Sequence, residues 1–376
     1  MSPRLKKFAR ISFISINCIS ILFYLMACLV PFFNAGSHWF IALLGLGFPI
    51  LFFVLLLFLI YWIIRRSRWA WICVAALLLG WQQWTATFSF HTQKTFHYNK
   101  EPGSLRVLTW NISSWGESNA SDNQNNLDVM VNLIKSSQAD VLCFQEYLYY
   151  KKKAYRDTVI PALKDAGYQY VYFAKINYSG RLYTTSVLTG TEIMSKYPIL
   201  NAGYFYYSEK DFIEPLIYAD LQINNQVIRV FTTHLQSVSF KGSDYDAIYS
   251  LKDPAEASVT GSKAIISKLK YAYSKRAVQA DILHEKIKAS PYPVIVCGDF
   301  NDVPNSYTYF TVKGNLQDAF LKKGSGMGRT LRFISPTLRI DYIMADKKFA
   351  IKQYTTFKVP YSDHYPVVAD IDLSGK

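Results

Sequence analysis

The stretch PVIVCGDFND, residues 293–302, decides the fold of this chain. Its apolar, β-rich run Val294–Cys297 is typical of a strand that is buried on both faces. The run stops at Gly298, and Asp299 and Asn301 follow at its end. Carboxylate and amide oxygens at the end of a buried strand suit a hard cation or a water molecule poised for attack. On this stretch alone, a polar turn that closes a core strand is an equally good explanation.

The same arrangement recurs along the chain. From Leu105 onward, β-rich apolar runs alternate with stretches of helical periodicity, which is the pattern of an α/β architecture. Each polar residue at a strand end has an ordinary explanation, such as a capping amide or a solvated strand end. Their recurrence favours one shared site. The residues at five predicted strand ends are Asn111, Glu146, His234, Asp299 with Asn301, and Asp363 with His364, and Asp341 lies within a sixth strand.

The N-terminal segment has a different composition from the rest. No Asp or Glu precedes Glu101, whereas seven of the 41 Lys and Arg residues fall within the first 68 positions. The other 34 Lys and Arg residues stand against 27 Asp and Glu, so half of the formal charge of +14 belongs to this segment. The remaining charge suits an anionic substrate or a lipid surface and does not distinguish between them.

Residues 1–84 are predicted to form a membrane segment with about three transmembrane helices. Ile11–Phe33 and Trp39–Ile64 are apolar runs long enough to cross a bilayer, which takes roughly 20 residues. Trp69–Trp84 is a third, shorter run flanked by tryptophans, which fit an aromatic belt. Residues 85–104 are polar with scattered aromatics and are predicted to be a linker.

Basic residues cluster before the first run and between the second and the third. The positive-inside rule then places both clusters in the cytoplasm and everything after Trp84 outside it. The prediction is therefore an integral protein of the cytoplasmic (inner) membrane with an extracytoplasmic domain. If the third run only lies at the interface, the domain is cytoplasmic instead.

Six short motifs resemble those of the endonuclease/exonuclease/phosphatase superfamily, the DNase I-like metal-dependent phosphoesterases. In chain order they are Leu-Thr-Trp-Asn (108–111), Cys-Phe-Gln-Glu (143–146), Thr-His-Leu (233–235), Gly-Asp-Phe-Asn (298–301), Arg-Ile-Asp-Tyr-Ile (339–343) and Ser-Asp-His-Tyr-Pro-Val (362–367). The resemblance implies that residues 105–376 form the catalytic domain. It also implies a four-layer α/β sandwich, with two mixed β-sheets face to face and helices outside, preceded by the transmembrane helices.

The resemblance further implies a divalent metal site for Mg²⁺ or Mn²⁺. Glu146 would be the principal ligand, with Asn111 and Asp363 completing or supporting the coordination sphere. A hard cation prefers such carboxylate and amide oxygens. Ser113 stands where several relatives carry an acidic residue, which argues against a second metal on that side. Glu192 is also unusual for the family and receives no role.

The remaining motif residues are implied to handle water and protons. Asp299 and Asn301 would position the attacking water and a phosphate oxygen. His364, held by Asp341, would orient or deprotonate that water. His234 would donate a hydrogen bond or a proton toward the phosphoryl oxygens.

The predicted function is that of a membrane-anchored, Mg²⁺-dependent phosphoesterase that hydrolyses phosphodiester bonds, with a nuclease as the leading version. A phospholipid or glycolipid headgroup phosphoesterase, of the sphingomyelinase-like or GPI-remodelling-like kind, is the alternative. The aromatic and basic tract 147–153 suits either stacked bases or a lipid headgroup surface. Membrane tethering and exposed tyrosines favour the lipid alternative, and the absence of a dense Arg/Lys stripe counts against a dedicated DNA enzyme. A catalytically inactive binding module is the third possibility. The predicted partners are a phosphate-ester substrate, nucleic acid or phospholipid headgroup, and the membrane, with no obligate protein partner inferred.

Overall fold

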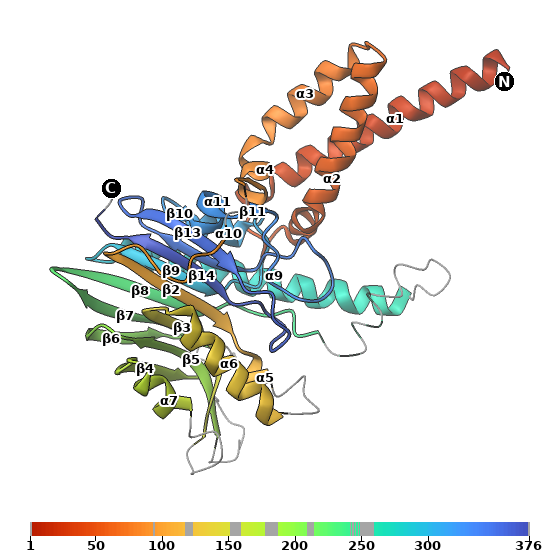
Figure 1. Cartoon of the computed structure of the whole chain (residues 1–376). Coiled ribbons are helices and arrows are strands. Elements are labelled where there is room, and N and C mark those ends of the chain that lie inside the picture. The colour runs from red at the N-terminus through yellow and green to blue at the C-terminus, as the bar shows by residue number, and fades with distance from the viewer. Residues whose placement is uncertain are drawn as a thin grey trace.

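The structure is a computed structural model that combines an α/β sandwich with a group of N-terminal helices (Figure 1). It describes residues 2–92, 95–116, 123–150, 159–176, 187–208, 214–240, 242, 244, 246, 248 and 259–374.

Two six-stranded mixed sheets form the body of the molecule. In spatial order, the first sheet consists of β13 (Ala350–Thr356), β14 (Val367–Asp372), β2 (Ser104–Asn111), β3 (Val141–Tyr150), β5 (Val187–Ser195) and β4 (Tyr170–Lys175). The second sheet consists of β10 (Gln317–Asp318), β12 (Asp341–Ala345), β9 (Val294–Asp299), β8 (Gln226–His234), β7 (Leu216–Ile223) and β6 (Ile199–Phe205).

The two sheets pack face to face, and helices cover their outer faces (Figure 1). The apolar core between the sheets joins residues such as Val107 and Val141 of the first sheet to Ile217 and Ile295 of the second. Outside the first sheet lie α6 (Asn123–Ser137) and α7 (Val159–Asp165), and outside the second lie α9 (Val259–Lys288) and α10 (Tyr307–Lys313). The predicted four-layer α/β sandwich is confirmed.

The strand directions bring the predicted strand ends to one edge. β2 runs parallel to β3, and β8 runs parallel to β9, so each pair ends at the same edge. β12 and β14 run antiparallel to their neighbours and start at that edge, where Asp341 pairs with Asp299 and Val367 pairs with Thr109. Polar residues that end or precede these strands are therefore gathered together by the sheet topology.

The N-terminal helices project from the sandwich as an extended group (Figure 1). α1 (Pro3–Cys28) and α2 (Trp39–Ile64) are long and apolar enough, by length and composition, to cross a membrane. The third predicted span is divided at Gly80 into α3 (Trp69–Leu79) and α4 (Trp81–Thr87). The N-terminus and the turn between α2 and α3, which carry the basic clusters, lie at the ends of the helices away from the sandwich (Figure 1).

These helices pack directly against the sandwich. The Asn305 side chain donates a hydrogen bond to the carbonyl oxygen of Ala27, at the end of α1 (2.9 Å). A Cβ atom added to Gly45 of α2 would collide with the carbonyl oxygen of Asn305. The buried guanidinium of Arg339 donates to the carbonyl oxygen of Ala86 (2.7 Å). The contact between helices and sandwich is therefore close and partly polar.

Part of segment 85–104 also pairs with the sandwich. Within it, β1 (Ser89–Phe90) forms a short antiparallel ladder with β11 (Ser325–Gly326), next to α11 (Ala319–Lys323). The Arg106 guanidinium of β2 donates to the carbonyl oxygens of residues 97 and 98. The segment therefore follows the surface of the sandwich at several points.

Candidate active site

Glu146 occupies a bulge in β3. The pairing of β3 with β5 shifts register between Phe144 and Tyr147, and Glu146 has a φ of 52°. This left-handed conformation is uncommon for a residue with a Cβ atom, and a bulge of this kind re-aims a side chain. The strand was expected to end here, but it continues to Tyr150. The bulge turns the carboxylate toward the edge where the other strand ends lie.

Gly298 allows β8 and β9 to approach closely next to the site. Its φ is 133°, and an added Cβ atom would collide with the carbonyl oxygen of Thr233. Only glycine fits this backbone conformation and spacing. The following pair in the ladder is His234 with Asp299, so the approach of the two backbones sets an imidazole beside a carboxylate.

Asp299 lies at the centre of the site and is fully buried. Its Oδ1 accepts a hydrogen bond from the Asn301 amide nitrogen (2.8 Å). Its Oδ2 accepts from the side-chain amides of Asn111 (3.1 Å) and Asn301 (3.2 Å). The same Oδ2 lies 3.6 Å from Nε2 of His234 and 3.6 Å from Nε2 of His364. One carboxylate oxygen therefore faces both histidines.

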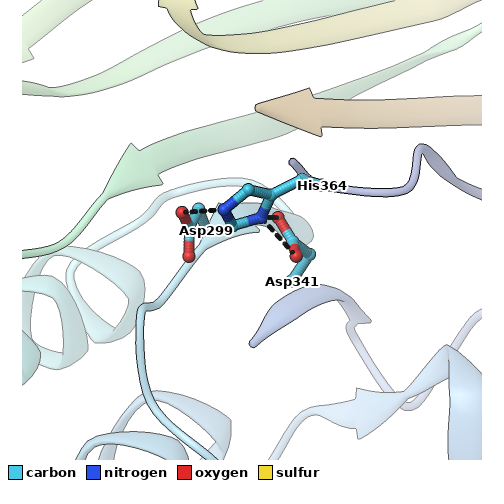
Figure 2. Close-up of side chains that lie close together, drawn as sticks. All are labelled: Asp299, Asp341 and His364. Atoms are coloured by element: carbon cyan, nitrogen blue, oxygen red, sulfur yellow. Dashed lines mark hydrogen bonds and ion pairs between the residues drawn. The ribbon is translucent and has the colours of Figure 1, made fainter. Parts of the chain in front are cut away.

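His364 is held from its other side by Asp341 (Figure 2). Its Nδ1 lies 2.9 Å and 3.1 Å from the two oxygens of Asp341. Asp341 and Asp299 thus flank the ring, one at each nitrogen. The backbone carbonyl oxygen of His364 accepts from the Trp110 indole (2.9 Å), which fixes the segment before β14.

His234 has a carboxylate partner that the sequence reasoning missed. Its Nδ1 lies 3.6 Å from Oε1 of Glu214, which is almost fully buried. Glu214 also accepts hydrogen bonds from the Glu146 amide nitrogen (2.9 Å) and the Thr191 hydroxyl (2.6 Å). The site therefore contains two histidine–carboxylate pairs on opposite sides of Asp299. The only sequence signal for Glu214 is its position just before β7, at the edge where the other site residues lie.

The surrounding carboxylates change the proton affinities of the histidines. Burial alone would lower the pKa of His234, but Glu214, Asp299 and Glu146 outweigh it and raise that pKa to about 10. Burial would likewise lower the pKa of His364, but Asp341 and Asp299 raise it well above its usual value. Without a metal ion, both imidazoles are therefore held as cations at neutral pH.

The pKa values of two carboxylates at the site are also raised. Burial raises the pKa of Asp299, and the nearby Asp341 adds to the effect while the two histidines oppose it. Burial also raises the pKa of Glu146, and the charges of Glu214 and Asp363 raise it further. Negative charge is therefore crowded at this edge, and a cation would relieve it.

The predicted metal ligands Asn111, Glu146 and Asp363 lie together at this edge. Asn111 Nδ2 donates to Oε1 of Glu146 (3.0 Å), and Asn111 Oδ1 accepts from the Ser113 amide nitrogen (3.0 Å). Asp363 is half-buried and close enough for its charge to raise the pKa of Glu146. Two carboxylates and an amide are the oxygen donors that a hard divalent cation prefers, so the donor set fits Mg²⁺ or Mn²⁺.

A second set of possible ligand atoms lies deeper. Atoms of Asp299, Asp341 and His364 lie within 4.8 Å of one another. His364 already uses Nδ1 for its bond to Asp341 (Figure 2). The hydrogen-bonded arrangement is therefore better suited to holding the imidazole than to surrounding an ion.

The structure thus brings all eight predicted site residues to one edge. Seven of them line a single cavity, and Asp341 lies behind His364. The seven are Asn111, Glu146, His234, Asp299, Asn301, Asp363 and His364.

Two buried polar side chains of α9 contact the segment that follows β8. Arg276 bonds the Asp302 carboxylate (3.2 Å) and the Gln236 carbonyl oxygen (2.8 Å). Gln279 accepts from the Gln236 amide nitrogen (2.8 Å). Both therefore hold the segment after β8. Residues 151–153 of the aromatic and basic tract lie outside the described residues.

Two facing mixed sheets with carboxylates and histidines gathered at one edge define the class of α/β-sandwich hydrolases that act on phosphoesters. The chain belongs to the Endonuclease/Exonuclease/phosphatase family, which matches residues 108–364. Residues 9–87 match a second family, described as a domain of unknown function (DUF8431). No curated protein matches the chain.

Solved structures share the fold at low sequence identity. An endonuclease/exonuclease/phosphatase from Beutenbergia cavernae DSM 12333 is 19% identical, with a TM-score of 0.51 and 71% of each chain covered. A family protein from Leptotrichia buccalis C-1013-b is 16% identical, with a TM-score of 0.50, and 71% of this chain and 99% of that chain covered. The human Nocturnin catalytic domain with bound sulfate is 19% identical, with a TM-score of 0.51 and coverages of 72% and 94%.

Proposed function

We propose that this protein is a membrane-anchored, divalent-metal-dependent phosphoesterase that hydrolyses phosphodiester bonds. The observation that carries the proposal is the arrangement of the histidines and carboxylates around Asp299. Two histidines face its Oδ2 at 3.6 Å, and each has a carboxylate at its other ring nitrogen. Activation of water and protonation of a leaving oxygen both need a histidine oriented in this way.

Glu146, Asp363 and Asn111 would hold the Mg²⁺ or Mn²⁺ ion, with Glu146 as the principal ligand. When bound, the ion would supply Lewis-acid polarisation of a phosphoryl oxygen and offset the charge that develops there. The charges of Glu214 and Asp363 raise the pKa of Glu146, as does its burial, which is consistent with a site arranged to receive a cation.

The side chains of the protein would carry the protons. Asp341 fixes His364 so that Nε2 points toward Asp299. His364 would orient the attacking water, and Asp299 would take the proton that this water loses as its oxygen attacks phosphorus. The bond from phosphorus to the leaving alcohol oxygen then breaks. His234, oriented by Glu214, would give that oxygen a proton. Asn301 would keep Asp299 in position through the bonds described above.

This chemistry is common to a nuclease, which the sequence favours, and to a lipid headgroup phosphoesterase, which is the alternative. The chemistry of the cavity walls bears on the choice between these two substrates. The third possibility, an inactive binding module, would keep the fold without turnover.

Purified full-length protein in detergent provides the test of the reaction. We expect hydrolysis of bis(p-nitrophenyl) phosphate with Mg²⁺ or Mn²⁺ and its loss in EDTA. Glu146→Gln and His364→Ala should each lower kcat at least about a hundredfold. Glu285→Gln is a matched control because Glu285 is exposed on α9, outside the site. Turnover that is unchanged by EDTA and by Glu146→Gln would contradict the proposal, and no turnover under any condition would favour the binding module.

The proposed location is the cytoplasmic membrane with the catalytic domain outside the cytoplasm. It is supported by the basic clusters at the ends of the helices away from the sandwich (Figure 1). A reporter that is active only in the cytoplasm, fused after Lys376, should remain silent, whereas the same reporter before Met1 should be active. Activity of the C-terminal fusion would place the catalytic domain in the cytoplasm.

A further inference from the structure

The cavity that contains the site has one polar end and an apolar remainder. It encloses about 560 Å³ and is lined both by the site residues and by apolar side chains from α2, α9 and nearby loops. This volume is typical of a site for a small molecule, since such pockets measure roughly 300–1,000 Å³. The apolar part is continuous with the polar end, so one ligand can occupy both.

One wall belongs to a helix that is able to cross a membrane. Leu43, Leu46, Gly47 and Ile50 of α2 line the cavity, and we call these four residues the α2 wall. Their spacing of three, four and seven positions places them on one face of the helix. Ile50 is 67% exposed and Leu46 is 36% exposed, so the wall also opens to the surroundings of the helix. A Cβ atom added to Gly47 would meet nothing within 4 Å, so this residue leaves a channel in the wall.

A second wall comes from the long helix of the sandwich. Ile265, Leu269 and Tyr273 of α9 line the cavity at intervals of four residues, and we call them the α9 wall. An apolar cluster around Val303 and Ile340 also lines the cavity. A ligand that reaches the carboxylates and histidines from α2 therefore passes between apolar surfaces.

The described lining of the cavity offers no basic track for a nucleic acid backbone. Among the described residues that line the cavity, Arg276 is the only one with a Lys or Arg side chain. Its guanidinium already bonds Asp302 and Gln236. A nucleic-acid groove combines a basic track for the backbone with aromatic side chains that stack on bases. Apolar walls that continue into a membrane-type helix instead suit a hydrocarbon chain.

We propose that the substrate is an amphiphilic phosphoester drawn from the bilayer. Its phosphate lies at the carboxylates and histidines, and its hydrocarbon chain lies between the α2 wall and the α9 wall. This inference rests on the proposed phosphoesterase function and specifies its substrate class. The α2 wall serves as a specificity determinant because it contacts the part of the substrate that does not react.

A series of substrates with one scissile group and different chains tests this inference. Full-length protein in nanodiscs with Mg²⁺ would be given p-nitrophenyl phosphodiesters whose second ester is methyl, hexyl or dodecyl. Hydrolysis by water releases p-nitrophenol and leaves the alkyl phosphate in every case. We expect kcat/KM to rise at least tenfold from methyl to dodecyl, because each methylene in contact with the walls adds favourable transfer free energy. Equal rates along the series would overturn the inference and leave the phosphoesterase function intact. No hydrolysis of any ester would contradict the proposed function itself.

Gly47→Leu places a side chain at the channel in the α2 wall, where an added Cβ atom meets nothing within 4 Å. We expect it to lower the ratio of dodecyl to methyl kcat/KM at least tenfold. Leu57→Trp is the matched control, since Leu57 is on the same face two turns further along α2 and does not line the cavity. It should leave the ratio unchanged. An unchanged ratio in Gly47→Leu, or an equal fall in both variants, would overturn the assignment of the wall.

A binding experiment in EDTA is independent of turnover. A dodecyl phosphodiester with a photoreactive diazirine at the chain end should label peptides that contain residues 43–50 or 265–273. Gly47→Leu should reduce this labelling severalfold, and Leu57→Trp should not. Labelling confined to other segments would overturn the inference.

Discussion

Single residues decide how the two histidines are presented to the substrate. Glu214 lies 3.6 Å from Nδ1 of His234 and accepts a bond from the backbone of Glu146. We predict that Glu214→Gln lowers kcat about 10- to 100-fold, because the imidazole loses the charge that orients it. The measurement is a double-mutant cycle with His234→Ala. A residue that acts through His234 adds little further loss in the His234→Ala background, so fully additive losses would contradict this positioning role.

Glu192 is a buried acid within the first sheet. It pairs with Phe144 of β3 and Phe173 of β4 and is fully buried. Neither carboxylate oxygen has a hydrogen-bond partner among the described residues. Burial therefore raises the pKa of Glu192 well above its ordinary value of 4.5, and the folded protein keeps it protonated.

This burial predicts a pH dependence of stability. The unfolded chain releases the Glu192 proton above pH 4.5, whereas the folded chain retains it, so stability is full below that pH and falls as the pH rises toward the folded pKa. The loss is about 1.4 kcal/mol per pH unit in this window. Glu192→Gln removes the ionisation, so the thermal midpoint of this variant should rise relative to that of the natural protein as the pH increases above 4.5 toward the folded pKa. Glu285→Gln should follow the natural curve. Parallel curves for the natural protein and Glu192→Gln would show that the carboxyl is ionised in the fold.

At the scale of elements, the close approach of β8 and β9 depends on one glycine. Gly298→Ala would collide with Thr233, whereas Gly103→Ala meets open space although Gly103 also has a positive φ of 82°. Both substitutions strain the backbone by about 1–3 kcal/mol. We predict that only Gly298→Ala adds a steric loss and separates His234 from Asp299. Chemical denaturation and activity with bis(p-nitrophenyl) phosphate measure the two effects. Equal destabilisation by both variants would contradict the steric argument.

The same elements show what the sequence can predict. β9 is buried on both faces, so its continuous apolar run Val294–Cys297 identifies it within two residues. The edge strands β6 and β13 were not predicted, because they are partly exposed and lack such a run. The site residues could be identified from their strand-end positions. The bulge at Glu146 and the pairing of Glu214 with His234 depend on tertiary contacts that no local pattern records.

At the scale of the whole molecule, the N-terminal helices form part of the cavity in addition to being apolar enough to cross a membrane. α2 supplies one wall of the cavity, and the sandwich bonds the end of α1 through Asn305. Under the proposed function, this arrangement would let the enzyme meet its substrate at the edge of the bilayer. The sequence predicted the long apolar run that forms α2. It did not predict the contact between α2 and the site, because α2 and the site residues lie far apart along the chain.

Two glycines of α2 have different surroundings: Gly45 contacts the sandwich, and Gly47 belongs to the cavity wall. Gly45 packs against the carbonyl oxygen of Asn305, whereas Gly47 faces open space two residues later. Alanine at either position improves helix propensity by about 1 kcal/mol. We predict that Gly47→Ala keeps or raises the thermal midpoint. Gly45→Ala should lower it, because α2 has to move away from the sandwich at a cost of about 1–3 kcal/mol. Gly45→Ala should also increase proteolysis within residues 85–104, where the chain passes from the helices to the sandwich. If both variants behave alike in both measurements, the contact at Asn305 does not hold the helices to the catalytic domain.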